Sequence, residues 1–186
     1  VHCIHITEEE MDIIKESGSS VVHNPESNMN NGVGYARVMD MYDKGINIGI
    51  GTDGINSSVL KQMQTALLLA RHESRNPCTA INKIPRMLLE YNPGILNRIT
   101  GWDTGEIAPG NAADITIVDY DSPTLFDENN FYSHLLFGMS QSAVDTTICN
   151  GKTIMRHKKI TCVDEAEIYV RTREMAQKVW AAVEKI

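Results

Sequence analysis

The chain has 186 residues, of which 42% are hydrophobic and 22% are charged, as in an ordinary globular domain. Its formal net charge of -7 argues against binding to nucleic acids or anionic membranes, since both normally require clustered basic residues. No apolar run approaches the ~20 residues that a membrane span needs. The four cysteines lack the spacing of a zinc or redox motif, so we interpret them as reduced thiols of a cytoplasmic protein.

The first five residues, Val1–His5, form a short apolar run that predicts a strand. They contain neither a start methionine nor a signal peptide, and we expect the strand to continue a longer sequence. Thr7 is followed three residues later by Glu10, which is the spacing of a capping box. A short helix is therefore predicted from there to Ser17-Gly18, where glycine ends it.

Two further strands are predicted at Ser20–His23 and Ile46–Ile50. A polar, glycine-containing loop is expected from Asn24 to Gly34, and a second short helix at Val38–Tyr42. The alternation of strands and helices implies a parallel sheet, either in a barrel or in a doubly wound fold. In both folds, sites form beyond the carboxyl ends of the strands.

The middle of the chain, residues 59–100, is predicted to be helical, because apolar residues recur there at helical spacing. The dipeptide Asn76-Pro77 is expected to break the first helix. A second helix is predicted over Ile84–Tyr91 and is expected to stop at Asn92-Pro93-Gly94, with a short helix from Ile95 to Thr100 after it.

The C-terminal third has a different pattern. A strand is predicted at Ala113–Asp119. Asn150-Gly151 lies between two runs rich in β-branched residues, Val144–Cys149 and Lys152–Arg156, which is a strong hairpin signal. A small antiparallel β-unit is therefore predicted, followed by an amphipathic helix over Asp164–Glu184.

Asp53 is the first candidate functional residue, because it follows the third strand between glycines that allow close backbone approach. Such a carboxylate can bind a metal or act as a general base, but it can equally close a turn or cap a helix. His2 and His5 are three residues apart, so they face opposite sides of a regular strand. We take His2 as the candidate and assign His5 a structural role. A hydrogen-bonded place in the core is the alternative for His2.

A second polar feature, His23-Asn24-Pro25-Glu26-Ser27-Asn28, begins where the second strand ends. A rigid polar loop at this edge of a sheet suits substrate recognition. The alternative is a turn in which side chains form local hydrogen bonds to the backbone.

In this order, His2-Cys3-Ile4-His5, His23–Met29 and Gly51-Thr52-Asp53-Gly54 resemble the amidohydrolase superfamily. The similar branch contains chlorohydrolases, guanine deaminase and adenosyl-nucleoside deaminases. Gly105–Asp114 and Asn150-Gly151-Lys152 resemble parts of that family's small β-domain. Within the branch, Ser133–Gly138 and the tail through Trp180 are most similar to SsnA-type aminohydrolases linked to selenium metabolism.

The resemblance implies an α/β fold, namely the C-terminal half of a (β/α)8 TIM-type metal-dependent hydrolase barrel with a small composite β-sandwich. Residues 1–104 would supply strands six to eight of the barrel and the helices after them. Residues 105–163 would supply the C-terminal part of the β-sandwich, and residues 164–186 a C-terminal helix.

By the same resemblance, His2 orients the attacking water and moves protons, and Asp53 binds the metal and acts as general base. His23, Asn24 and Asn28 would contact the substrate. The implied cofactor is one divalent ion, zinc or iron, which lowers the pKa of its bound water. The family's His-x-His pair and its strand-five His are absent, so this chain alone is expected to be inactive and to bind no metal there.

The implied function is hydrolysis of a C–N bond other than a peptide bond, by an aminohydrolase or deaminase of a small heterocyclic substrate. One alternative is a chlorohydrolase or cyclic-amide hydrolase of the same superfamily. An alternative of another class is an inactive scaffold or assembly module. The expected partners are a small molecule and a second copy of the full-length protein, with neither nucleic acid nor membrane.

Overall fold

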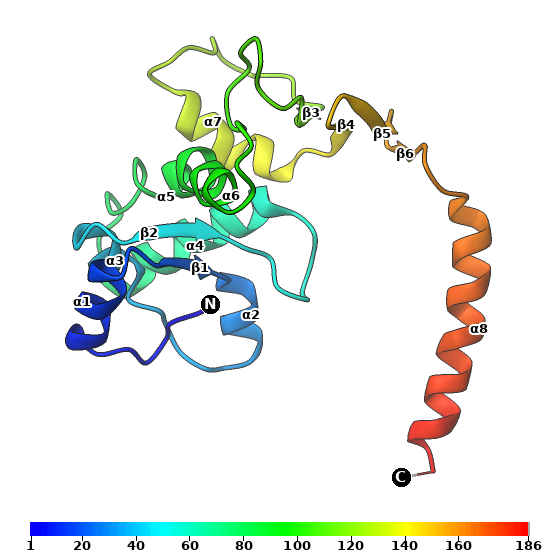
Figure 1. Cartoon of the computed structure of the whole chain (residues 1–186), viewed down its shortest axis with the longest axis horizontal. Helices are drawn as coiled ribbons and strands as arrows, with labels where there is room; N and C mark the ends of the chain where they lie inside the picture. The colour runs from blue at the N-terminus through cyan, green and yellow to red at the C-terminus, as the bar shows by residue number, and fades with distance from the viewer. Residues whose placement is uncertain (186) are drawn as a thin grey trace. The chain divides into compact units, whose positions relative to one another are not determined.

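The computed structural model describes residues 1–185 and divides the chain into two compact units (Figure 1). The first unit combines residues 1–112 with residues 119–142, and the second combines residues 113–118 with the described residues from 143 onward. The first unit contains, in chain order, α1 (Glu8–Glu16), β1 (Ser20–His23), α2 (Pro25–Asn30), α3 (Val38–Asp43), β2 (Asn47–Ile50), α4 (Val59–Ser74), α5 (Ile84–Arg86), a π-helical turn (Met87–Tyr91), α6 (Asn92–Thr100), α7 (Phe131–Phe137) and a 3-10 turn (Met139–Gln141).

The two strands of the first unit pair in parallel, with Ser20 opposite Asn47 and His23 opposite Ile50. This confirms the predicted parallel arrangement, in which β1 and β2 are joined through helices. Because the strands run in the same direction, the segments that follow His23 and Ile50 leave the sheet at the same edge.

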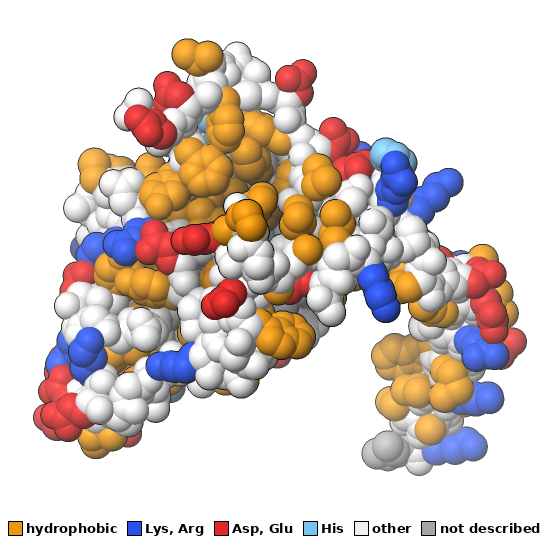
Figure 2. Space-filling model, turned by 45° about the horizontal axis from the view of Figure 1, so that its top comes forward, with side chains coloured by type: hydrophobic (Ala, Val, Ile, Leu, Met, Phe, Trp, Pro, Cys, Tyr) orange, Lys and Arg blue, Asp and Glu red, His pale blue; other side chains and the backbone are white. Residues whose placement is uncertain are grey.

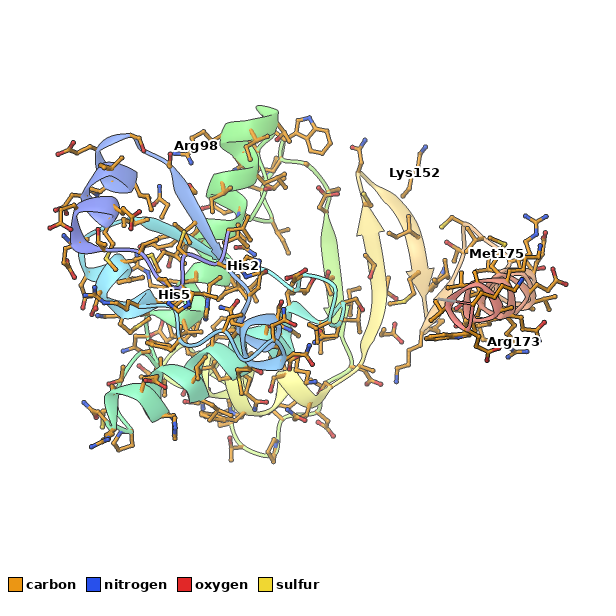
Figure 3. All side chains as sticks on the ribbon, turned by 90° about the horizontal axis from the view of Figure 1, so that it is seen from below. His2, His5, Arg98, Lys152, Arg173 and Met175 are labelled. Carbon is orange, nitrogen blue, oxygen red and sulfur yellow. The ribbon has the colours of Figure 1, made fainter. Side chains whose placement is uncertain are left out.

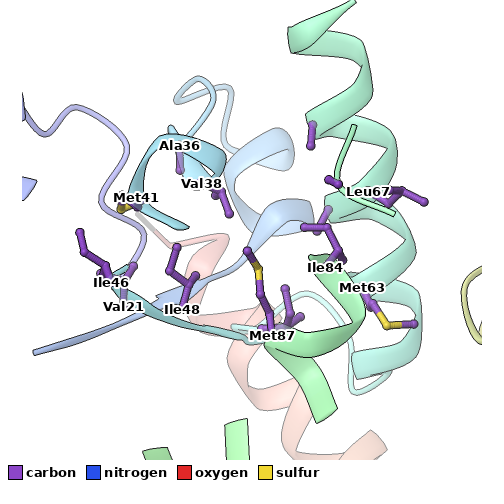
Figure 4. Packing of buried hydrophobic residues seen from close by; sticks show 14 of the residues in the cluster. Val21, Ala36, Val38, Met41, Ile46, Ile48, Met63, Leu67, Ile84 and Met87 are labelled. Atoms are coloured by element: carbon purple, nitrogen blue, oxygen red, sulfur yellow. The ribbon is translucent and has the colours of Figure 1, made fainter. Parts of the chain in front are cut away.

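The core of the first unit lies where this small sheet meets α1, α3, α4 and the helical segment after Ile84 (Figure 4). Its side chains are apolar, and several methionines fill it, as their flexible side chains suit irregular gaps. The most deeply buried members include Met11, Val21, Met41, Ile46, Ile48, Met63, Leu67, Ile84, Met87 and Leu136.

The first residues do not form the strand that the sequence predicted. His2 and Cys3 have φ values of 68° and 49°, in the left-handed region that a strand excludes. The His2 N–H still donates to the carbonyl of Val22 at 3.0 Å, so the segment lies beside β1 without continuing the ladder. Helix α1 does form as expected, and Thr7 and Glu10 make both hydrogen bonds of the capping box.

The predicted loop from Asn24 to Gly34 was wrong in part, since it begins with helix α2. Pro25 lies in the first turn, where the missing N–H of proline costs no helical hydrogen bond. The helix is short, yet it buries Ser27 and Asn28. Tertiary contacts rather than helix propensity therefore stabilise it.

The predicted helix stop at Asn92-Pro93-Gly94 was also wrong. A π-helical turn ends at Tyr91 and continues directly into α6, with Pro93 in the first turn of that helix. Asn92 also binds the backbone of Ile50, accepting from its N–H at 2.8 Å and donating to its carbonyl at 2.9 Å. The side chain thereby satisfies polar backbone groups of β2.

The second unit contains an antiparallel sheet of β3 (Ile115–Val118), β4 (Val144–Cys149), β5 (Lys152–Arg156) and β6 (Lys159–Ile160), in that order. The predicted hairpin is confirmed, and both Asn150 and Gly151 have positive φ, as its tight turn requires. Helix α8 (Glu165–Val183) is capped by Asp164, and charged side chains lie along one side of it and hydrophobic ones along the other (Figure 2). Within residues 1–185, no helix is both long and apolar enough to cross a membrane.

Candidate active site

His2 and Asp53 come together beyond the ends of β1 and β2. Nε2 of His2 lies 3.6 Å from Oδ2 of Asp53, although the two residues are far apart in the sequence. Their side chains are 35% and 41% exposed, so a small molecule could reach both. His5 is exposed and lies apart from His2 along the first segment (Figure 3). The structure thus provides one histidine and one carboxylate at the edge of the sheet where the sequence analysis expected them.

Two hydrogen bonds hold the carboxylate of Asp53. Its Oδ2 accepts from the hydroxyl of Ser27 at 2.7 Å, and its Oδ1 accepts from the N–H of Gly54 at 2.7 Å. The Ser27 bond first, and then the Gly54 bond, lower the pKa of the Asp53 carboxyl below its ordinary value. Asp53 also has a φ of 51°, a left-handed conformation that Asp tolerates better than most residues. Asp53 therefore makes the local hydrogen bond that is typical of a turn residue, to Gly54, and also a hydrogen bond to the distant helix α2, through Ser27.

His2 is held from the other side of its ring. Nδ1 of His2 lies 2.8 Å from Oδ1 of Asn28, which belongs to helix α2. Since Ser27 binds Asp53, two successive residues of one helical turn contact the two candidate catalytic side chains.

The three residues predicted to contact substrate are enclosed: His23, Asn24 and Asn28 are 1%, 3% and 1% exposed. Burial, and then the charge of His2, lower the pKa of His23 to about 4, so its ring is neutral near pH 7. Within the described residues, Nδ1 of His23 and Nδ2 of Asn28 are buried without a hydrogen-bond partner. Substrate contact through these residues stays a prediction.

The sequence indicates Ser27 only as a member of the polar loop suited to substrate recognition, whereas in the structure this residue makes the shortest contact to Asp53 from another element. A helix beginning at Pro25 would have placed Ser27 and Asn28 together on its inner face. The signal for this helix in the sequence is Pro25, because proline is favoured in the first turn of a helix.

The residues present do not make up a complete metal centre. In the part of the chain that the structure describes, no group of three or more His, Cys, Asp and Glu residues could hold a metal ion. Asp53 and His2 offer one carboxylate and one imidazole, whereas zinc in proteins takes three or four protein ligands. Further ligands would have to come from outside these residues.

Residues 1–154 match the amidohydrolase family. The chain belongs to this family. The resemblance seen in the three polar motifs is thereby confirmed at the level of the family.

This amidohydrolase chain is similar to several curated deaminases. It is 30% identical over 183 residues to 5-methylthioadenosine/S-adenosylhomocysteine deaminase of Clostridium tetani, covering 96% of the chain and 42% of that enzyme. It is 32% identical over 186 residues to 5'-deoxyadenosine deaminase of Methanosarcina mazei, covering 98% of the chain and again 42% of the relative. The chain thus spans less than half the length of the curated relatives that it matches.

Solved structures of similar fold cover a similar part of their own chains. An adenosine deaminase from Xanthomonas campestris with bound zinc superposes with a TM-score of 0.77 at 25% identity, covering 97% of this chain and 42% of that one. The atrazine chlorohydrolase of Arthrobacter aurescens, complexed with zinc, superposes with a TM-score of 0.73 at 21% identity, covering 93% of this chain and 39% of that one. The second likeness supports the fold alone.

Proposed function

We propose that this chain supplies part of the active site of a metal-dependent aminohydrolase that removes the amino group of an adenosine-type nucleoside. The observation that carries the proposal is the approach of His2 to Asp53, 3.6 Å apart at the exit of two parallel strands. The substrate class comes from the names of the relatives, which are deaminases of 5-methylthioadenosine, S-adenosylhomocysteine and 5'-deoxyadenosine.

In this proposal, the chain's own residues move protons. Asp53, a carboxylate whose pKa Ser27 and Gly54 lower further below its ordinary acidic value, takes a proton from the attacking water. The water oxygen bonds to the ring carbon, the C–N bond breaks, and the leaving amine gains the proton and departs as ammonia. His2, with Nε2 beside the Asp53 carboxylate, passes protons between the water and the amine. A divalent ion, zinc or iron, would lower the pKa of the water, but the residues described here are too few to hold it.

The finer architecture belongs to the same proposal. We place residues 1–104 in a (β/α)8 barrel as strands six to eight and their helices, residues 105–163 in a composite β-sandwich, and residues 164–186 in a C-terminal helix. The parallel pairing of β1 with β2 and the separate antiparallel sheet support this assignment. His23, Asn24 and Asn28 would line the substrate loop, and the complete protein would be a cytoplasmic homodimer that binds a small molecule.

A test requires the full-length protein. With zinc supplied, it should release ammonia from 5-methylthioadenosine or 5'-deoxyadenosine, whereas atrazine should be a poor substrate. Asp53→Asn should lower turnover by more than about 1,000-fold and weaken zinc binding, because Asn lacks the charge and the basicity of the carboxylate. Ammonia release and metal analysis measure the two effects.

Three results would contradict the proposal. An inactive wild-type protein that contains zinc would remove the deaminase function. Dechlorination of atrazine in preference to deamination would favour the chlorohydrolase alternative. Normal turnover with full metal content in Asp53→Asn would reduce Asp53 to a turn residue.

A further inference from the structure

Helix α2 contacts the candidate site with one face and helix α4 with the other. Its inner side chains, Ser27 and Asn28, are 2% and 1% exposed and contact Asp53 and His2. Its outer face carries Glu26, which points toward α4 and makes most of its contacts there. The short helix therefore links the site to the body of the first unit.

The contact with Asn28 decides which nitrogen of His2 carries the proton. An amide oxygen has lone pairs and no hydrogen, so it can only accept. Nδ1 of His2, 2.8 Å from Oδ1 of Asn28, must then be the donor. In the neutral ring, the other nitrogen, Nε2, is left as the free base, and it is the nitrogen that faces Asp53 at 3.6 Å.

Ser27 has the corresponding effect on the carboxylate. Its single hydroxyl proton is donated to Oδ2 of Asp53 at 2.7 Å, the same oxygen that faces His2. Since Gly54 holds the other oxygen, the carboxylate cannot rotate freely. The separation of His2 and Asp53 is therefore set by one turn of α2.

The contacts of Glu26, on the other face of α2, hold this helical turn in place. The Glu26 side chain is only 14% exposed, and its carboxylate accepts from Gln62 at 3.0 Å and from Thr65 at 3.2 Å. Gln62, which is fully buried, also accepts from the backbone N–H of Glu26 at 3.2 Å. Lys61 and Asn56 complete the cluster, so α2 is joined both to α4 and to the loop that follows Asp53.

We infer that Asn28 and Ser27 are positioning residues: Asn28 fixes the Nδ1–H tautomer of His2, and Ser27 fixes the orientation of the Asp53 carboxylate. This inference rests on the proposed function for its catalytic consequence, although the tautomer is a property of the protein itself. It differs from the expectation that Asn28 contacts substrate. A positioning residue changes turnover, whereas a substrate contact changes binding.

The experiment uses zinc-loaded full-length protein labelled with 15N-histidine, with the His2 signals identified by their loss in His2→Gln. Under alkaline conditions, where an ordinary imidazole is neutral, the ring-nitrogen shifts report the tautomer. The wild type should show His2 protonated at Nδ1. Asn28→Leu should lose this preference, and its kcat should fall by about 10- to 100-fold with KM within about twofold.

Two variants serve as controls. Asn28→Asp keeps an oxygen acceptor at the same place, so it should retain the Nδ1–H tautomer and recover part of the turnover. Asn30→Leu makes the same change as Asn28→Leu at an exposed position of the same helix, and it should leave the His2 spectrum and kcat unchanged.

Several outcomes would overturn the inference. A wild-type spectrum with the proton on Nε2 does so even if no variant folds. An Asn28→Leu variant that keeps the tautomer, or that raises KM alone, shows that Asn28 does not act through His2. Conversely, a protein with the Nδ1–H tautomer but no deaminase activity would retain the positioning role of Asn28 and remove the proposed function, so the two failures are distinguishable.

Discussion

The segments that follow the two parallel strands differ sharply, although both leave the same edge of the sheet. After β1, the chain turns into a short helix whose residues Asn24, Ser27 and Asn28 are almost fully buried. After β2, the chain is exposed, and Asp53 keeps 41% of its side-chain surface. The buried segment orients groups, and the exposed segment presents the carboxylate that would react. The segment after β1 thus provides rigid support, and the neighbouring segment after β2 provides the accessible carboxylate.

The largest effect expected from this division concerns His2, the residue that both segments contact. In the full-length protein, His2→Ala should slow turnover by about 100- to 10,000-fold, because a proton carrier is lost. Zinc content should stay near that of the wild type, since the carboxylate of Asp53 keeps its bonds to Ser27 and Gly54. Steady-state kinetics with metal analysis measures both.

Loss of zinc together with activity in His2→Ala would instead make His2 a metal ligand. A decrease in turnover of less than about tenfold in His2→Ala would mean that His2 lies at the edge of the site without a catalytic role. His5→Ala serves as the matched control, because His5 is the exposed histidine of the same segment and should change turnover little.

A smaller effect is expected where the two segments touch. A Cβ atom added at Gly51 would lie 2.3 Å from Oδ1 of Asn24 and 2.6 Å from Cγ1 of Val22, distances that real atoms do not adopt. Since Asn24 is buried, its side chain cannot move aside easily. Gly51→Ala should therefore lower the free energy of unfolding by about 1–3 kcal/mol, as overpacking typically does.

Gly54 offers the control for this substitution. A Cβ there meets no atom within 4 Å among the described residues, so Gly54→Ala should change stability little. Urea unfolding of both variants compares them directly. If Gly54→Ala destabilises the protein as much as Gly51→Ala, the close packing of Gly51 against Asn24 is not the cause.

Much of the fold could be predicted because the deciding interactions are local. The capping box needs only Thr7 and Glu10, three residues apart, and the hairpin turn needs only Asn150-Gly151. The place of Asp53 at the exit of β2 also followed from sequence, whereas His2 reaches it from a segment that lies beside β1 without being a strand.

The rest could not be predicted, because it depends on partners far along the chain. Helix α2 is fixed by contacts of Ser27 with Asp53 and of Glu26 with Gln62, whereas the local signal, Asn24-Pro25, fits a polar loop or a turn as well as the start of a helix. The helix that continues through Asn92 depends in the same way on the backbone of Ile50, 42 residues earlier. For α7, the apolar residues Leu135 and Leu136 find buried places that no short-range pattern specified.

A change of similar size to that of Gly51→Ala, but one that appears only on acidification, is expected from the buried segment alone as a dependence of stability on pH. His23 has a folded-state pKa of about 4, mainly because burial disfavours its charged form, against an ordinary value of 6.5. Between these values the unfolded chain binds a proton that the folded protein does not. The contribution of His23 is therefore fully present above the ordinary pKa and declines as the pH falls toward 4.

From pH 7 to pH 5 this linkage amounts to about 2 kcal/mol of lost stability. The variant His23→Gln does not titrate, so the wild type should lose about 2 kcal/mol more than the variant over the same interval. Urea unfolding of both proteins at the two pH values provides the comparison. Equal losses in the two proteins would mean that His23 is protonated, or reached by solvent, in the folded state. In that case the contrast between a buried segment after β1 and an exposed segment after β2 would not hold at His23, the residue with which β1 ends.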